Sequence, residues 1–151
     1  MSWELFEKVK NIGLPAGSYA IFGSGPMAVR GLRDCHDIDL IVTEEVFNEY
    51  KNESGWELKD VENGDEVLAN DGVEIFNDWG PGEWNVKQLI EDSEIIEGLP
   101  FVRLIEVLKW KKLLKREKDL KDIEMIEKYF KERLNTVPNV EEWKNPENKV
   151  E

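Results

Sequence analysis

The strongest constraint on the fold lies in residues 18–42, where two strand patterns flank a glycine-rich turn. Residues 18–22 form a compact apolar run bounded by glycines, which indicates a buried strand. Gly23-Ser24-Gly25-Pro26 then turns the chain, and its proline suits the first position of a helix that we expect to run through residue 32. Residues 37–42 open with two aspartates and continue with apolar, mostly β-branched residues, which predicts a second strand.

Strand and helix patterns also occur before and after residues 18–42. Helices are predicted over residues 3–12 and 43–52, and acidic residues in the first turn support the second. Three short strands are predicted over residues 56–61, 65–70 and 72–77, joined by turn signals at Asn63-Gly64 and Asn70-Asp71-Gly72. We therefore expect an α/β (α+β) domain with a mixed β-sheet of about five strands and flanking helices.

The remainder of the chain reads as helical after a turn-rich break at residues 77–84. One helix is predicted over residues 85–97, and an apolar stripe predicts a longer helical segment over residues 99–134, either straight or bent near 114–117. These patterns predict a sheet domain at 1–98 and a C-terminal helical segment at 99–134 packed on it. Residues 135–151 would form a tail, anchored if at all by Trp143.

Composition excludes several classes of protein. The 151 residues are 40% hydrophobic, enough for one substantial core, and the aromatic residues are spread along the chain, unlike those of a disordered protein. A single cysteine excludes an internal disulfide and a cysteine-rich zinc site. No apolar run approaches the roughly 20 residues of a membrane span, and the first ten residues lack a signal-peptide pattern. We expect a soluble, cytoplasmic protein without membrane contact.

The charge of −13 is unevenly distributed. Residues 1–99 hold 7 basic and 22 acidic side chains, whereas residues 100–134 hold 11 basic and 7 acidic ones. Because long nucleic acids are bound mainly through cationic neutralisation of phosphate, this balance argues against them as partners. Any anion site is expected to draw on the 100–134 segment.

Three acidic residues form the candidate catalytic and metal site. Asp37 and Asp39 alternate along one strand, so their side chains are expected on the same face, with Cα atoms about 7 Å apart. Glu74 joins them if its strand neighbours theirs. Carboxylates crowded together favour a hard divalent cation, and three of them can hold two Mg²⁺ or Mn²⁺ ions for phosphoryl transfer. Glu74 would also serve as the general base.

Gly23 and Ser24 form the candidate nucleotide-binding turn. A glycine turn between a strand and a helix offers backbone N–H groups and a positive helix end, which suit the phosphates of a nucleotide. The Ser24 hydroxyl adds a further donor.

Together these residues resemble the nucleotidyltransferase superfamily that includes DNA polymerase beta and the minimal nucleotidyltransferases of toxin–antitoxin systems. The resemblance rests on Gly23-Ser24, a short helix, Asp37-Ile-Asp39 at the head of a strand, and Glu74 on a later strand. It extends to Lys109 and to Arg116-Glu-Lys-Asp-Leu-Lys-Asp122, which looks like a helix that follows the catalytic domain in several of these families. The resemblance implies Mg²⁺-dependent transfer of a nucleoside monophosphate from an NTP, ATP first among them, to an unknown acceptor hydroxyl.

Other interpretations compete at each position. Gly23-Ser-Gly25-Pro-Met-Ala28 also satisfies the dinucleotide-binding pattern G-x-G-x-x-A. A dinucleotide fold carries its ribose-binding acid at the end of the next strand, whereas Asp37 and Asp39 lie at the start of theirs. Asp37 and Asp39 could be solvated surface acids. The same fold could also bind a nucleotide or a protein partner without catalysis.

Two groups outside this stretch have alternative roles. Lys109, Lys112 and Arg116 recur at helical spacing and could bind phosphates, or they could form a solvated face neutralised by Glu106, Glu117 and Asp119. Trp79 and Trp84 could stack on a base or acceptor, or could anchor their loop.

Overall fold

The computed structural model describes residues 3–60, 66–79 and 82–134. The chain divides into two compact units, residues 1–103 and residues 104–151. The predicted Asn63-Gly64 turn and the predicted tail with Trp143 lie outside the described residues. Within the described part of the chain, no helix combines the length and the apolar character needed to cross a membrane.

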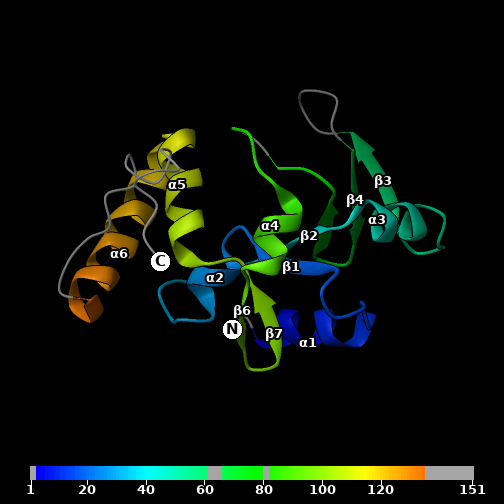
Figure 1. Cartoon of the computed structure of the whole chain (residues 1–151), viewed down its shortest axis with the longest axis horizontal. Coiled ribbons are helices and arrows are strands. Elements are labelled where there is room, and N and C mark those ends of the chain that lie inside the picture. The colour runs from blue at the N-terminus through cyan, green and yellow to red at the C-terminus, as the bar shows by residue number, and fades with distance from the viewer. Residues whose placement is uncertain (1–2, 61–65, 80–81, 135–151) are drawn as a thin grey trace. The chain divides into compact units, whose positions relative to one another are not determined.

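The first unit is built on one mixed β-sheet, which confirms the predicted fold class (Figure 1). Its strand order is β3-β4-β5-β2-β1-β7-β6. The β2–β5 and β1–β7 pairs are parallel and the other four pairs are antiparallel. The strands are β1 (Tyr19–Phe22), β2 (Ile38–Val42), β3 (Glu57–Asp60), β4 (Glu66–Asn70), β5 (Val73–Phe76), β6 (Glu94–Ile96) and β7 (Leu99–Phe101).

Among the described residues of this unit, four helices accompany the sheet: α1 (Trp3–Ile12), α2 (Gly25–Ala28), α3 (Glu44–Lys51) and α4 (Val86–Glu91). The first and third confirm the predicted helices. The Thr43 hydroxyl accepts a hydrogen bond of 3.4 Å from the Val46 N–H and so caps α3. Between β4 and β5, Asp71 and Gly72 both have positive φ angles, 46° and 85°, as the predicted tight turn requires.

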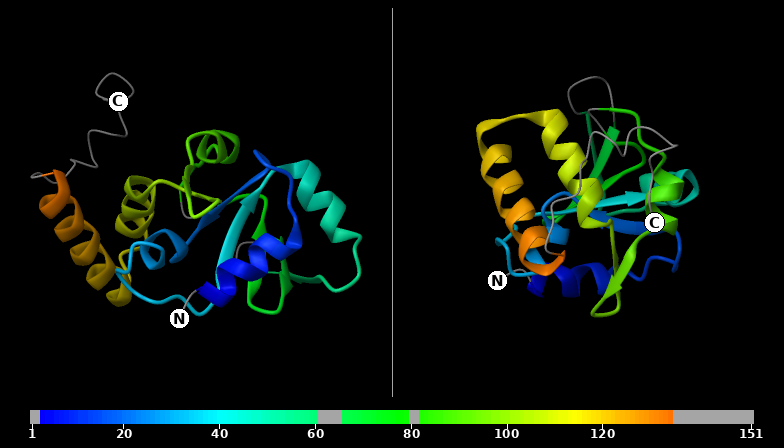
Figure 2. Two further views of the ribbon diagram at one scale, coloured as in Figure 1. Left: turned by 90° about the horizontal axis from the view of Figure 1, so that it is seen from below. Right: turned by 60° about the vertical axis from the view of Figure 1, so that its left-hand side comes forward.

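The two faces of the sheet are covered by different elements. On one face, α1 and α3 contribute to a core cluster with side chains from the central strands; its members include Phe6, Val9, Val46, Phe47, Ile21, Leu40, Ile75 and Phe101. The left view of Figure 2 shows α1 crossing this side of the sheet. Helix α4 packs against β1 and β2 (Figure 1), and its buried Leu89 and Ile90 do not belong to that cluster. Side chains that alternate along the central strands therefore lie on opposite faces of the sheet, one covered by α1 and α3 and the other by α4.

Two additional strands correct the prediction for residues 85–101. Helix α4 ends at Glu91, and the residues that we expected to continue it form β6. Strand β7 occupies the position where we expected the long helical segment to begin. Glu97 and Gly98, with φ angles of 52° and 81°, join the two strands in a two-residue hairpin. Pairing of β7 with β1, at Ile21 and Phe101, stabilises this hairpin through a contact that local sequence patterns do not reveal.

The second unit, in its described part, consists of two helices packed against each other, α5 (Leu104–Leu114) and α6 (Glu117–Leu134). Lys115 between them has a φ of 55°, which is incompatible with a continuous helix. The bent alternative for the helical segment is therefore confirmed.

Candidate functional site

The parallel pairing of β2 with β5 places Asp39 directly opposite Glu74. Both side chains are half-buried, and the residues on either side of each, Ile38 and Leu40 in β2 and Val73 and Ile75 in β5, are buried in the core. Because neighbouring strands lie about 4.8 Å apart, the two carboxylates project side by side from the same face of the sheet. The strand of Glu74 therefore neighbours that of Asp39, which is the condition under which Glu74 was expected to join the site.

Glu74 is flanked on its other side by a small residue. Its antiparallel neighbour in β4 is Ala69, whose methyl group leaves room above the sheet. Two other acids near this strand are engaged elsewhere: Glu66 of β4 forms an ion pair of 3.1 Å with Lys51, and Asp71 of the β4–β5 turn forms one of 3.1 Å with Lys8. Of these three acids, Glu74 is therefore the best placed to act together with Asp39.

Asp37 lies one residue before β2 and is exposed. The strand begins at Ile38, whose N–H donates a 2.8 Å hydrogen bond to the Gly72 carbonyl, so Asp37 stands outside the ladder that we expected to include it. Among the residues that the structure describes, no three His, Cys, Asp or Glu side chains gather closely enough to hold a metal ion. The pair Asp39 and Glu74 is thus assembled, whereas Asp37 occupies the exposed position typical of a solvated acid.

Gly23 brings the backbone of the turn against the Asp39 carboxylate. The preceding residue, Phe22, is the antiparallel partner of Asp39. Gly23 is buried with a φ of 64°, and a Cβ added there would lie 2.5 Å from Asp39 Oδ2. Only glycine satisfies both the backbone angle and this approach. The predicted turn and the predicted carboxylate therefore meet in space.

Ser24 follows as the first residue of a short helical turn. It occupies the N-cap position of α2, and its carbonyl accepts hydrogen bonds from the N–H groups of Met27 (3.2 Å) and Ala28 (2.9 Å). Its hydroxyl makes no capping hydrogen bond to α2. Helix α2 has only 4 residues and does not reach residue 32 as expected. So short a helix has little macrodipole, so any attraction for an anion must come from local N–H and O–H groups.

The antiparallel direction of β1 and β2 bears on the dinucleotide interpretation. A dinucleotide site requires a parallel βαβ unit after the glycine motif. Here Tyr19 pairs with Val42 and Phe22 with Asp39, so the strand after the motif runs the opposite way. The glycine pattern therefore lies outside such a unit.

Trp79 anchors its loop on the sheet. It is buried, stacks on Phe22 with ring centroids 4.5 Å apart and planes 13° apart, and contacts Phe76 edge to face at 4.8 Å. Trp84 is half-buried and meets Phe22 edge to face at 5.8 Å. For Trp79 the anchoring interpretation is confirmed, and its stacking partner Phe22 directly precedes Gly23 at the end of β1.

No protein-family model matches the chain, and no curated protein is significantly similar to it in sequence.

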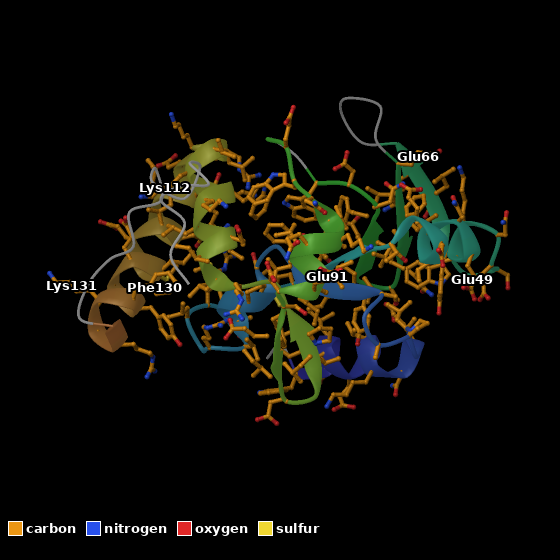
Figure 3. The ribbon with its side chains drawn as sticks, viewed as in Figure 1. Glu49, Glu66, Glu91, Lys112, Phe130 and Lys131 are labelled. Atoms are coloured by element: carbon orange, nitrogen blue, oxygen red, sulfur yellow. The ribbon has the colours of Figure 1, made fainter. Side chains whose placement is uncertain are left out.

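The three basic candidates of the second unit all have acidic partners within that unit. Lys109 pairs with Glu106 at 2.8 Å, Lys112 with Glu127 at 3.1 Å, and Arg116 with Asp119 at 2.6 Å. Two of these partners are acids that the solvated-face alternative named. Figure 3 shows Lys112 on α5 and Lys131 on α6.

A buried ion cluster in the second unit was not anticipated. Lys111 is 3% exposed, and its Nζ lies 2.8 Å from Asp122 Oδ2 and 3.5 Å from Asp119 Oδ1. Asp119 also accepts hydrogen bonds from the Arg116 backbone and side chain. Burial opposes ionisation of Asp119, but the Arg116 hydrogen bonds and the Lys111 charge outweigh it and lower its pKa. The segment from Arg116 to Asp122 had been singled out by its resemblance, and its two aspartates are spaced i, i+3 on α6, but neither signal pointed to Lys111.

The acidic character of the first unit is spread over several elements. Figure 3 shows Glu49 on α3, Glu66 on β4 and Glu91 on α4. A negative surface of this kind repels polyanions, so an anionic ligand must be held by local donors such as the Gly23-Ser24 turn, or arrive with its own cation.

Proposed function

We propose that this chain is a Mg²⁺-dependent nucleotidyltransferase that moves a nucleoside monophosphate from an NTP, ATP first among them, to an acceptor hydroxyl. The observation that carries the proposal is the placement of Asp39 opposite Glu74 with Gly23 packed against Asp39. Two carboxylates directly opposite each other are unfavourable alone, and a divalent cation between them relieves their repulsion.

The donor set suits magnesium. Carboxylate oxygens are ligands that this hard ion prefers, and it binds proteins through one or two carboxylates together with substrate phosphates. Asp39 and Glu74 would hold the ion, with Asp37 as an additional ligand from the residue before β2. When bound, magnesium neutralises charge on the triphosphate. An ion that arrives already bound to the triphosphate needs only one or two carboxylates from the protein, and Asp39 and Glu74 would supply two.

The turn and Glu74 would perform the remaining tasks. Gly23 and Ser24 would bind the triphosphate through backbone N–H groups and the Ser24 hydroxyl. The acceptor oxygen would attack the α-phosphorus, and the bond from that phosphorus to the bridging oxygen would break, so that pyrophosphate leaves with the electron pair. Glu74 would accept the hydroxyl proton.

The basic residues of the helical unit take a secondary place in the proposal. Lys109, Lys112 and Arg116 could bind phosphate only by exchanging the acidic partners that they have now. Arg116 is the most exposed of the three, with 46% of its side chain accessible, but an exchange would remove its hydrogen bonds to the buried Asp119.

The acceptor is proposed from charge. The acidic first unit disfavours a long nucleic acid and leaves a small molecule, a protein or an RNA end as acceptor.

Burial of Cys35, the only cysteine, agrees with a thiol kept reduced in the cytoplasm.

A second candidate is a catalytically silent protein that binds a nucleotide or a protein partner through the same fold. The exposed position of Asp37 favours it, because a two-ion site needs a third carboxylate.

Labelling separates the two candidates. Wild type would be incubated with each α-phosphate-labelled NTP, Mg²⁺ and cell extract, beside Asp39→Asn as the inactive control. Label transferred by wild type and not by Asp39→Asn supports the enzyme. Nucleotide binding by wild type without transfer in any fraction supports the silent protein.

A further inference from the structure

Helix α2 is too short to hold the Gly23-Ser24 turn in place by itself. It has 4 residues, and helices of this length are unstable without tertiary contacts. The position of the turn must therefore be set by whatever fixes α2 against the sheet.

Apolar packing fixes one end of α2. Gly25 lies so close to β1 that an added Cβ would overlap the Ile21 side chain and approach Phe101 of β7. Met27 is fully buried. These contacts hold the helix against β1 and β7.

The Arg30 guanidinium adds a polar contact to α2. Arg30, two residues after α2, donates from one terminal nitrogen to the Pro26 carbonyl at 2.7 Å and from the other to Glu94 Oε1 at 2.6 Å. The Arg30 side chain is 11% exposed and that of Glu94 is 35% exposed. Such a shielded, charge-assisted contact is stronger than an exposed ion pair.

These contacts close a ring through the sheet. From β1 the chain passes through the Gly23-Ser24 turn into α2, Arg30 then contacts Glu94 on β6, β6 pairs with β7, and β7 pairs with β1. Because these links are hydrogen bonds and chain connections, they restrict the movement of α2, and with it the turn, relative to β1. Arg30 and Glu94 form the polar side-chain link of this ring.

We propose that Arg30 and Glu94 are positioning residues for the triphosphate-binding turn. This inference rests on the proposed function. Neither residue needs to touch the nucleotide, because the pair acts by holding α2, and through it Gly23 and Ser24, against the sheet beside Asp39.

The test measures binding of inorganic tripolyphosphate with Mg²⁺ by calorimetry, at a temperature where each variant is folded. Arg30→Met and Glu94→Ala should each weaken binding about tenfold, within the range that small misplacements cost. The double variant should bind about as weakly as either single one, because both changes break the same link. Arg30→Lys should recover part of the affinity, since lysine keeps the charge but cannot make the forked contact.

The matched control is the ion pair of Lys51 and Glu66 in the same unit, which is 3.1 Å long with side chains 38% and 39% exposed. Lys51→Met should leave tripolyphosphate binding within about twofold of wild type. Hydrogen exchange adds a readout that needs no ligand: the amides of residues 23–25, 27 and 28 should exchange faster in Glu94→Ala than in Lys51→Met.

The outcomes distinguish the two proposals. Wild-type binding that Arg30→Met and Glu94→Ala leave unchanged would overturn the positioning role alone. Failure of wild type to bind tripolyphosphate with Mg²⁺ would overturn both the proposed function and this role.

Discussion

Gly23 and Asp39 are packed so closely that no side chain fits between them. A Cβ on Gly23 would lie 2.5 Å from Asp39 Oδ2, and the Gly23 φ of 64° is itself unfavourable for other residues. The glycine that begins the turn and the aspartate in the next strand are thus a single structural unit, formed where Phe22 pairs with Asp39.

Substitution of Gly23 by alanine is expected to disturb this unit specifically. Gly31→Ala is the matched control, because Gly31 has a similar φ of 75° and nothing within 4 Å of an added Cβ. Each change should cost about 1–2 kcal/mol of stability for the left-handed backbone. Gly23→Ala should lose more and should also lose Mg²⁺-dependent nucleotide binding, whereas Gly31→Ala should keep it. Equal unfolding free energies and equal binding would contradict the proposed close approach.

Asp39→Asn is expected to abolish stabilisation by Mg²⁺ and NTP. In wild type the two together should raise the melting temperature, because a ligand that binds only the folded state stabilises it by mass action. The amide of asparagine has nearly the same shape but lacks the charge. Asp34→Asn, an exposed acid in the loop before β2, serves as the control and should retain the shift. A shift of the same size in Asp39→Asn would remove the metal site from the proposal.

The class of nucleotide is expected to follow from the strand direction. ATP or another NTP should bind with metal, and NAD or FAD should not, because β1 and β2 are antiparallel and form no dinucleotide unit. Equilibrium dialysis with and without Mg²⁺ would compare the ligands. Metal-independent binding of NAD at micromolar affinity would return the dinucleotide interpretation to first place.

Glu74→Gln is expected to separate catalysis from binding. The change removes the proton acceptor, so transfer should fall by at least about 10²-fold, the usual scale for loss of a general base. Nucleotide binding should be less affected, because Asp39 remains beside the turn. Single-turnover transfer and calorimetric binding measure the two effects. Unchanged transfer would show that another acid, with Glu66 and Asp71 next in line, fills the role.

The buried cluster of the second unit is expected to show a defined pH dependence. Asp119 has a lowered pKa in the folded protein, so its stabilising contribution is present above the unfolded pKa of about 4 and is lost as the pH falls through the folded value. At pH 7, Asp119→Asn should cost about 3 kcal/mol, because it leaves Lys111 buried with one partner fewer.

Urea unfolding followed by far-UV circular dichroism would measure this effect between neutral and acidic pH. The difference between wild type and Asp119→Asn should shrink as the pH falls below about 4. Glu127→Gln, which breaks the pair with the one-third-exposed Lys112, should cost less than about 1 kcal/mol. Equal costs for the two changes would indicate that the cluster contributes no more than a surface pair.

Much of the fold could be predicted because its signals are local. The helices at α1 and α3 and the first five strands follow from hydrophobic period, capping residues and turn residues, all read within a few positions. The same signals left a straight and a bent helical segment open, and the positive φ of Lys115 decides for the bend. The β6–β7 hairpin was missed for the opposite reason. Its residues suit a helix or a strand, and pairing of Phe101 with Ile21, 80 residues away in the chain, decides between them.

For the candidate site, too, local sequence and tertiary structure account for different features. The sequence by itself identified the candidate residues, since a glycine turn and acids at the head of a strand require no partner to be recognised. Tertiary structure alone decided that Asp39 lies opposite Glu74, that Asp37 stays outside the strand, and that Arg30 reaches Glu94. Strand order, register and long-range ion pairs depend on contacts between distant segments, and a residue pattern within one segment cannot specify them.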